Sequence, residues 1–327
     1  MASNTEFVII TINAGGARRA VKDRLDLAQI ASDLSQLISS TIGRPDIIAV
    51  QESHQVWHPR QSTPLGTSQA IAQRLDPSYR SYFLEYLDSD SHAHPNKWDQ
   101  PLFSGFNRVQ QGNAVIISKS LTQWPWGSPP AGYPGKLAPI STQISRAALY
   151  STGNRDTEPR NLVVVPLSLG QRASLYFMAT HLTTLKREDR HDSRNPESQR
   201  ASNVRLAQVH EILRIVDELR KAERDNEQKP VPIILAGDFN AKPGSPELVA
   251  LEQTFLRFPP RWHDESIQRG LVWTHVGHKI HVDHILYNDP DGLLTPVDCF
   301  VPDPIQVGNI TDHLPVIAKF KIQQEEE

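Results

Sequence analysis

Polar residues that could bind metal ions or phosphate groups follow short apolar runs at several places in this chain. Five runs end in such residues, at Asn13, Glu52, His181, Asp238 with Asn240, and Asp312 with His313, and a sixth run contains Asp283. Carboxylate and amide oxygens are ligands that hard divalent cations prefer, and a histidine beside a carboxylate can transfer protons. One such residue alone after a strand is ordinarily a turn former or a helix cap. Five polar strand ends together indicate a single site at one rim of stacked sheets.

Hydrophobic periodicity predicts the elements that would position these residues. Short apolar runs bounded by turn residues predict strands at residues 7–12, 46–51, 113–118, 146–150, 161–167, 175–180, 231–236, 280–287 and 316–320. Apolar spacings of three and four predict helices at residues 25–42 and 196–224, with a shorter helix at 69–75. Residues 85–110 and 124–139 lack periodicity and are expected to be loops. We expect an antiparallel meander between residues 146 and 180, and two packed sheets with outer helices.

The composition is that of a globular protein. Of the 327 residues, 38% are hydrophobic and 22% are charged, which suffices for a sizeable core. The formal net charge of −3 argues against tight nonspecific binding to long DNA, which ordinarily needs a basic excess. Cys299 is the only cysteine, so no intramolecular disulfide can form. Since no signal peptide or transmembrane segment is visible, we expect a cytoplasmic protein. We expect one domain over residues 1–327, with a core from about residue 7 to 320.

The motifs together resemble one enzyme superfamily. The strings are Gln51-Glu52, Thr180-His181-Leu182, Gly237-Asp238-Phe239-Asn240, Val282-Asp283 and Thr311-Asp312-His313. Their order and approximate spacing resemble those of the endonuclease/exonuclease/phosphatase superfamily, which includes DNase I, deadenylases and neutral sphingomyelinases. The resemblance implies a four-layer α/β sandwich, with two mixed β-sheets face to face and helices outside. It also implies a phosphoesterase that depends on Mg²⁺ or Mn²⁺.

The resemblance implies a metal and phosphate site. Glu52 matches the metal-binding carboxylate of the superfamily, and Asp312 and Asn13 are expected to support the metal ion or its waters. Asn13 is also a candidate contact of the substrate phosphate. Arg146 resembles the arginine that many members direct at the phosphate, although a solvated cation at a strand edge is the alternative. A hard dication needs only one or two carboxylates and keeps several waters, which fits this set.

The resemblance also implies the catalytic residues. Asp238 is expected to orient or deprotonate the attacking water, and Asn240 to donate an N–H to the phosphoryl group. His313 is expected to act as a general base or a phosphate ligand, with Asp283 holding it in one tautomer. His181 matches a second histidine, which contacts the phosphate or protonates the leaving oxygen.

The substrate class follows less directly from the sequence. The central motif continues as Ala-Lys after Asn240, which disfavours the inositol-phosphate branch, and His181 favours the DNase I, sphingomyelinase or deadenylase branches. Aromatic and basic residues of the irregular segments could stack bases or merely cover the sheet: Trp57, Trp98, Phe103, Phe106 and Arg108. We predict a metal-dependent phosphodiesterase, foremost a nuclease acting on DNA or RNA, with no obligate protein partner. The alternatives are a phosphodiesterase or phosphatase for a lipid headgroup or small nucleotide, and a noncatalytic binding module of the same fold.

Overall fold

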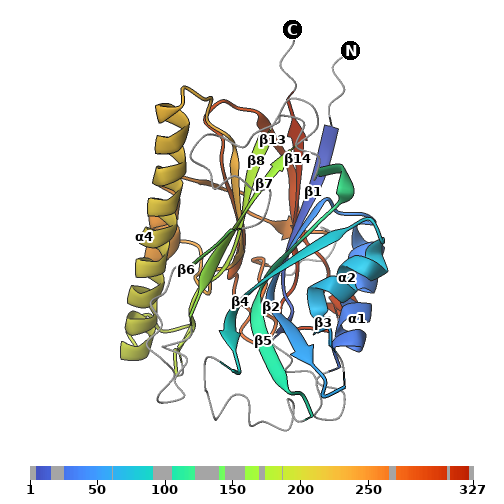
Figure 1. The fold of residues 1–327 in the computed structure, drawn as a ribbon. Helices are drawn as coiled ribbons and strands as arrows, with labels where there is room; N and C mark the ends of the chain where they lie inside the picture. Colours follow the sequence, from blue (N-terminus) through green and yellow to red (C-terminus); the bar gives the residue numbers. More distant parts are fainter. Residues whose placement is uncertain are drawn as a thin grey trace.

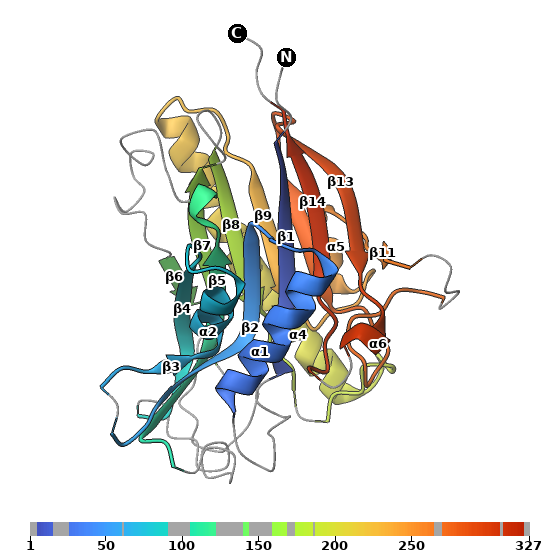
Figure 2. The same ribbon diagram turned by 90° about the vertical axis from the view of Figure 1, so that its right-hand side faces the viewer.

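Two mixed β-sheets lie face to face, and helices cover their outer faces (Figures 1 and 2). The computed structural model describes residues 5–15, 26–60, 62–90, 105–121, 140–143, 159–168, 174–185, 187–264, 270–307 and 310–323. The fold predicted from the sequence is confirmed: it is a four-layer α/β sandwich with two mixed sheets inside and helices outside.

The first sheet contains the first and the last strand of the described chain. Its strands run in the order β11-β13-β14-β1-β2-β5-β4, with β3 paired to β2. Their bounds are β1 Thr5–Asn13, β2 Ile47–Trp57, β3 Leu65–Gly66, β4 Arg80–Asp88, β5 Arg108–Ile117, β11 Arg261–Trp262, β13 Leu294–Val301 and β14 Val316–Ile322. The central pair β1–β2 is parallel, whereas β14 and β5 flank it in the antiparallel sense. The polar end of β1 therefore lies next to the part of β2 that carries Glu52.

The second sheet has the strand order β10-β12-β9-β8-β7-β6. Its bounds are β6 Ile140–Gln143, β7 Asn161–Ser168, β8 Ser174–His181, β9 Ile233–Asp238, β10 Leu256–Arg257 and β12 Asp283–Asn288. The run β6-β7-β8 is an antiparallel meander, and its β7–β8 pairing confirms that part of the prediction. Strands β8 and β9 are parallel because the long helix α4 connects them.

Helices form the two outer layers. Their bounds are α1 Leu27–Thr41, α2 Thr67–Leu75, α4 Pro196–Asp225, α5 Pro246–Leu251 and α6 Pro304–Val307, with a 3-10 turn, η3, at Lys119–Leu121. Figure 1 shows α4 on one side of the sandwich and α1 with α2 on the other. In the described part of the chain, no helix combines the length and apolar character required to cross a bilayer.

Strand alternation separates the inner core from the outer one. In β9, Ile234 and Ala236 belong to the core between the sheets, whereas Ile233 and Leu235 belong to the core beneath α4. Successive strand residues point to opposite faces, so Asp238 continues the inner row of Ala236. The active-site candidates thus lie where the apolar core between the sheets ends.

One predicted loop differs from the structure, and strands β4 and β13 were not predicted. The loop expected over residues 85–110 is wrong at both ends, because β4 continues to Asp88 and β5 starts at Arg108. Polar residues and a register shift between Glu85 and Leu87 interrupt these strand ends, which are held by ladder pairing, so they lack the regular apolar pattern that predicts strands. Strand β13 was missed because Pro296 and a register shift interrupt its pattern. The strand expected at residues 146–150 and the loop expected at 124–139 lie outside the described residues.

Candidate active site

Strand register brings the predicted residues of the second sheet together. In the parallel pair β8–β9, His181 lies opposite Asp238, and in the antiparallel pair β9–β12, Asp283 lies opposite Asp238. Gly237 permits this arrangement, since a Cβ there would lie 2.0 Å from the backbone oxygen of Thr180. The close approach of the two strands therefore requires glycine before Asp238.

Asp238 is the centre of the site. Its Oδ2 accepts a hydrogen bond from Asn13 Nδ2 (3.0 Å) and lies 3.5 Å from His181 Nε2 and 3.7 Å from His313 Nε2. Its Oδ1 accepts from the backbone N–H of Asn240 at 2.8 Å. The carboxylate is buried, so these contacts replace its hydration. One oxygen thus connects the first sheet, the second sheet and the segment that ends in His313.

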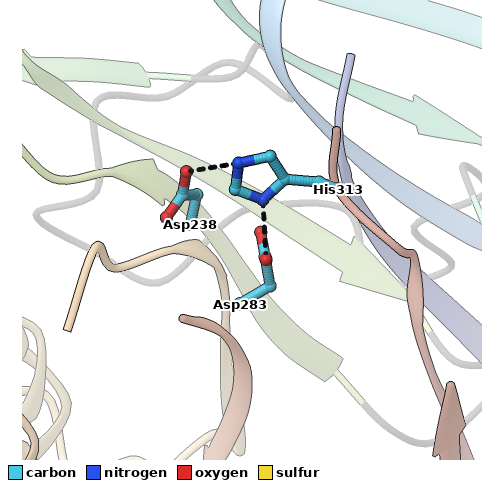
Figure 3. Close-up of side chains that lie close together, drawn as sticks. All are labelled: Asp238, Asp283 and His313. Carbon is cyan, nitrogen blue, oxygen red and sulfur yellow. Dashed lines mark hydrogen bonds and ion pairs between the residues drawn. The ribbon is translucent and has the colours of Figure 1, made fainter. Parts of the chain in front are cut away.

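His313 is held between two carboxylates, as Figure 3 shows. Its Nδ1 lies 2.8 Å from Asp283 Oδ2, and its Nε2 points toward Asp238. Thr274, which sequence reasoning missed, supports this pair: its Oγ1 accepts from the backbone N–H of Asp283, and its carbonyl accepts from that of Leu314 (2.7 Å). The imidazole orientation is therefore fixed from both ends.

Asp238 and His313 both have raised pKa values, but for different physical reasons. Burial and the neighbouring Asp283 carboxylate raise the pKa of Asp238 to about 6. Burial alone would lower the pKa of His313, but the Asp283 and Asp238 carboxylates outweigh it and raise that pKa to about 10. At neutral pH the His313 imidazole is therefore a cation, whereas Asp238 titrates near the pH at which a general base is most effective.

Glu52 does not lie at the end of its strand, contrary to the prediction. Strand β2 continues for five residues to Trp57, and its register with β5 shifts between Val50 and Ser53. Glu52 lies in this irregularity with a φ of 53°. The extra residue of a bulge re-aims a side chain, and Glu52 here lies within reach of Asn13. The prediction was wrong because the apolar run stops at Val50, although the strand itself continues beyond it.

The oxygen donors near Glu52 fit a hard divalent cation. Glu52 is half-buried, and its hydrogen-bond contacts with two described residues are long, at 3.4 Å from Asn13 Nδ2 and 3.5 Å from Gln111 Nε2. Asp312 is also half-buried and approaches Gly15 from the facing segment. Asn13 Oδ1 accepts from the backbone N–H of Gly15 and keeps a second lone pair. Carboxylate and amide oxygens of this kind suit Mg²⁺ or Mn²⁺.

A second group has ligand atoms within 4.8 Å of one another, namely Asp238, Asp283 and His313. We interpret it as a proton-transfer set and not as a metal site. His313 Nδ1 is already hydrogen-bonded to Asp283, and its Nε2 faces Asp238, so both ring nitrogens are engaged with carboxylates.

Asn240 is fixed by contacts on both sides of its amide. Its Nδ2 donates to the carbonyl of Leu182 at 2.9 Å, and its Oδ1 accepts from Arg190 Nη2 at 2.6 Å. The Arg190 contact fixes which end of the amide is the oxygen. Since Nδ2 has two N–H groups and gives one to Leu182, its second N–H can meet a ligand. Arg190 lies in the loop between β8 and α4, among the basic residues after His181 that the sequence predicts as possible contacts of a phosphate backbone, although acidic residues interleave with them.

Only some of the basic and aromatic residues predicted as substrate contacts lie in the part of the chain that the structure describes. Arg146, Trp98 and Phe103 lie outside the described residues. Arg108 lies over the Trp57 ring at 4.9 Å but also forms an ion pair with Asp88, and Phe106 packs against the small core cluster around Val56. These contacts favour a covering role over a base-stacking one.

Arg160 is a further cation that sequence reasoning missed. It is buried just before β7, with its guanidinium 4.9 Å from the Tyr86 ring, and Tyr86 lies 6.4 Å from the His181 ring. In the sequence, Arg160 could have been noticed as an arginine directly before the strand that pairs with β8.

The chain belongs to the endonuclease/exonuclease/phosphatase family, whose model matches residues 10–313. Members of this family are generally phosphoester hydrolases. A search of curated protein sequences gave no match.

Solved structures of similar fold come from bacteria and animals. A family protein from Bacteroides thetaiotaomicron is 12% identical, with a TM-score of 0.57 over 99% of this chain and 100% of that one. A family protein from Leptotrichia buccalis is 17% identical, with a TM-score of 0.55 over 96% and 99%. Truncated Caenorhabditis elegans TDP2 is 14% identical, with a TM-score of 0.53 over 96% and 97%. At these identities the likeness establishes the fold.

Proposed function

We propose that this single-domain chain is a phosphodiesterase that depends on Mg²⁺ or Mn²⁺ and hydrolyses phosphodiester bonds in nucleic acid. The observation that carries the proposal is the arrangement around Asp238, where a carboxylate with a raised pKa lies beside a cationic imidazole and next to the amides of Asn13 and Asn240. A base, a cation and neutral N–H donors are what attack of water on a phosphodiester requires.

The cation would be held by Glu52, with Asp312 and the Asn13 amide oxygen. When bound, a divalent cation neutralises the phosphate oxygens and stabilises the charge that develops on them. The Asn13 amide also connects Glu52 to Asp238, since its Nδ2 contacts both carboxylates. This amide therefore keeps the metal carboxylate and the catalytic carboxylate in one geometry.

The chain's own residues supply the proton transfers. Asp238 accepts a proton from a water molecule as the water oxygen bonds to phosphorus. His313, kept cationic by Asp283, and the free N–H of Asn240 stabilise the negative charge of the phosphorane. The ester P–O bond then breaks, and the leaving oxygen takes a proton from His181. The contact between His181 Nε2 and Asp238 orients this second imidazole toward the same centre.

The proposal is tested with purified protein, bis(p-nitrophenyl) phosphate, and a panel of single-stranded RNA, plasmid DNA, sphingomyelin and a nucleotide diester. We expect hydrolysis with Mg²⁺ or Mn²⁺, loss of activity in EDTA, and recovery when the metal is restored. Asp238→Asn should lower kcat by at least about a hundredfold. The matched control is Asp298→Asn, because Asp298 pairs with Arg261 on the surface of β13. Unchanged rates in excess chelator, or full activity of Asp238→Asn, contradict the proposal.

A further inference from the structure

Arg190 directs an available hydrogen-bond donor into the site. Its Nη2 donates to Asn240 Oδ1 (2.6 Å) and Thr184 Oγ1 (3.2 Å), and its carbonyl accepts from Lys242 Nζ (2.7 Å). Its Nη1 is buried and has no hydrogen-bond partner among the residues that the structure describes. Leaving a buried donor without an acceptor is costly, more so for a charged group. The geometry therefore suggests that Nη1 meets an oxygen of the substrate.

The loop that carries Arg190 is firmly anchored. At its start, the backbone N–H of Thr183 donates to Gln208 Oε1 at 3.0 Å, and Gln208 Nε2 donates back to Thr183 Oγ1 at 2.6 Å. The buried Arg205 joins the loop to the helical layer through ion pairs with Glu188 (2.8 Å) and Glu247 (2.9 Å). The Arg190 guanidinium is thus held by structure on both sides before a substrate arrives, which lowers the entropy cost of binding.

A row of imidazoles runs outward from the catalytic centre on the same side. The ring centroids of His313 and His275 are 4.8 Å apart, those of His275 and His278 are 4.6 Å apart, and those of His278 and His191 are 6.2 Å apart. His275 is buried, whereas His278 and His191 are exposed, so the row reaches the surface. His191 follows Arg190 directly in the chain, so its ring contact with His278 brings the outer end of the row to the arginine segment.

Besides Asp238 and Asp283, which contact His313, two carboxylates lie near the outer part of this row, and both have other partners. Asp189 Oδ1 accepts from the backbone N–H groups of His191 (2.9 Å) and Asp192 (3.3 Å). Asp312 belongs to the oxygen set proposed for the cation. The groups left to meet a ligand are therefore N–H donors: a guanidinium and two imidazoles, with exposed Lys242 beside them.

We propose that Arg190, His278 and His191 form a subsite for a second phosphate group, next to the phosphodiester that is cleaved. This inference rests on the proposed function and names its substrate class: an oligonucleotide, whose backbone places another phosphate next to the scissile one. Guanidinium and imidazole N–H donors match phosphate oxygens. A choline headgroup would instead bring a cation toward the arginine, which disfavours a sphingomyelin-like substrate.

The test compares thymidine dinucleotides with no terminal phosphate, with a 5′-phosphate and with a 3′-phosphate, all in saturating Mg²⁺. The measured quantity is the ratio of kcat/KM with and without the terminal phosphate. One charge-assisted contact predicts a wild-type ratio of about 10 to 100 for one of the two phosphorylated forms. We expect the ratio to fall to near 1 in Arg190→Gln and in His278→Gln, and to recover in part in Arg190→Lys. Arg194→Gln is the matched control, since Arg194 lies in the same loop, is 90% exposed and pairs with Asp192.

The outcomes separate this inference from the function on which it depends. A wild-type ratio near 1, or a ratio that survives both Arg190→Gln and His278→Gln, overturns the subsite while metal-dependent hydrolysis of the dinucleotides still supports the proposed function. If sphingomyelin is cleaved faster than every dinucleotide, the substrate class is overturned. If no dinucleotide is cleaved by the wild type, the proposed function fails as well. Melting temperatures of all variants show whether a change in ratio accompanies a change in folding.

Discussion

Replacing Asp283 by asparagine tests the central pair of the site. The substitution keeps the shape of the side chain but removes the carboxylate that lies 2.8 Å from His313 Nδ1. The two carboxylates raise the pKa of His313 from 6.5 to about 10, against the opposing effect of burial. At about 1.4 kcal/mol per pKa unit, the net shift that remains after the opposing effect of burial corresponds to about 5 kcal/mol.

The part of the His313 pKa shift that is due to Asp283 can be estimated from the free energy of one charge-assisted hydrogen bond. Such a bond contributes about 1.5 to 3 kcal/mol, so we expect the pKa of His313 to fall by about one to two in Asp283→Asn. The asparagine can also favour the wrong tautomer of the imidazole. In the proposed mechanism His313 stabilises the phosphorane, and loss of one such electrostatic contact lowers kcat by about a hundred- to a thousandfold.

The assay is the pH dependence of kcat/KM. In the wild type we expect the rate to rise with pH as Asp238 loses its proton near pH 6, and to fall as His313 loses its proton near pH 10. In Asp283→Asn the alkaline limb should move to lower pH, and Asp298→Asn should leave it in place. An imidazole titration followed by NMR assigns the limb to His313. An unchanged alkaline limb together with undiminished kcat would refute the reasoning.

The same variant has a stability signature. The folded-state pKa of His313 is raised, so its contribution is fully present below the unfolded pKa near 6.5 and is lost as pH rises through about 10. The stability difference between wild type and Asp283→Asn should therefore be largest below pH 6.5 and shrink toward pH 10. Urea unfolding at a series of pH values measures it.

Three further predictions concern the metal carboxylate, the strand junction and acid stability. Glu52→Gln should raise the Mg²⁺ concentration for half-maximal activity at least about tenfold, measured by metal titration, because a charged ligand becomes neutral; an unchanged midpoint would remove Glu52 from the metal set. Gly237→Ala should cost about 3 kcal/mol of unfolding free energy, since its Cβ would overlap the backbone of β8; Gly277→Ala, where contacts are ordinary, should cost far less in the same melts. Burial lowers the pKa of His281 to about 4 and that of His284 well below 6.5, so stability should decline as pH falls below 6.5; a flat stability profile from pH 6.5 to 4.5 would contradict this.

The sequence predicted most elements because apolar runs were long and clearly bounded. The helix expected at residues 196–224 is α4, Pro196–Asp225, whose start is marked by the Asn195 cap and a proline in the first turn. The prediction failed where pairing between strands replaced the apolar pattern. Strands β4 and β5 extend through polar residues, and Glu52 lies in a bulge that no local signal reveals.

In the site, too, some residues could be predicted from local sequence and others depend on contacts in the folded structure. Residue types alone singled out His181, Asp238 and Asp283, because polar groups at the ends of buried strands are unusual as a set. Arg190 was predicted only as one of several basic residues that could contact a phosphate backbone, and Thr274 was missed, since an arginine in a polar loop and a threonine before a turn are ordinary in sequence. Their significance comes from hydrogen bonds to Asn240 and Asp283, respectively.

The sequence by itself determined the chemistry that is available: which residues carry carboxylates, imidazoles and amides, and which apolar runs must be buried. Those properties are local, and they follow from side-chain type and spacing. The tertiary structure decided which of these groups share a proton and which face a cation. Contacts such as Asn13 to Asp238 span 225 positions of the chain, and the register of two separate sheets sets their distance. Burial between those sheets also shifts the pKa values of Asp238 and His313, since the loss of hydration depends on neighbours that no local pattern names.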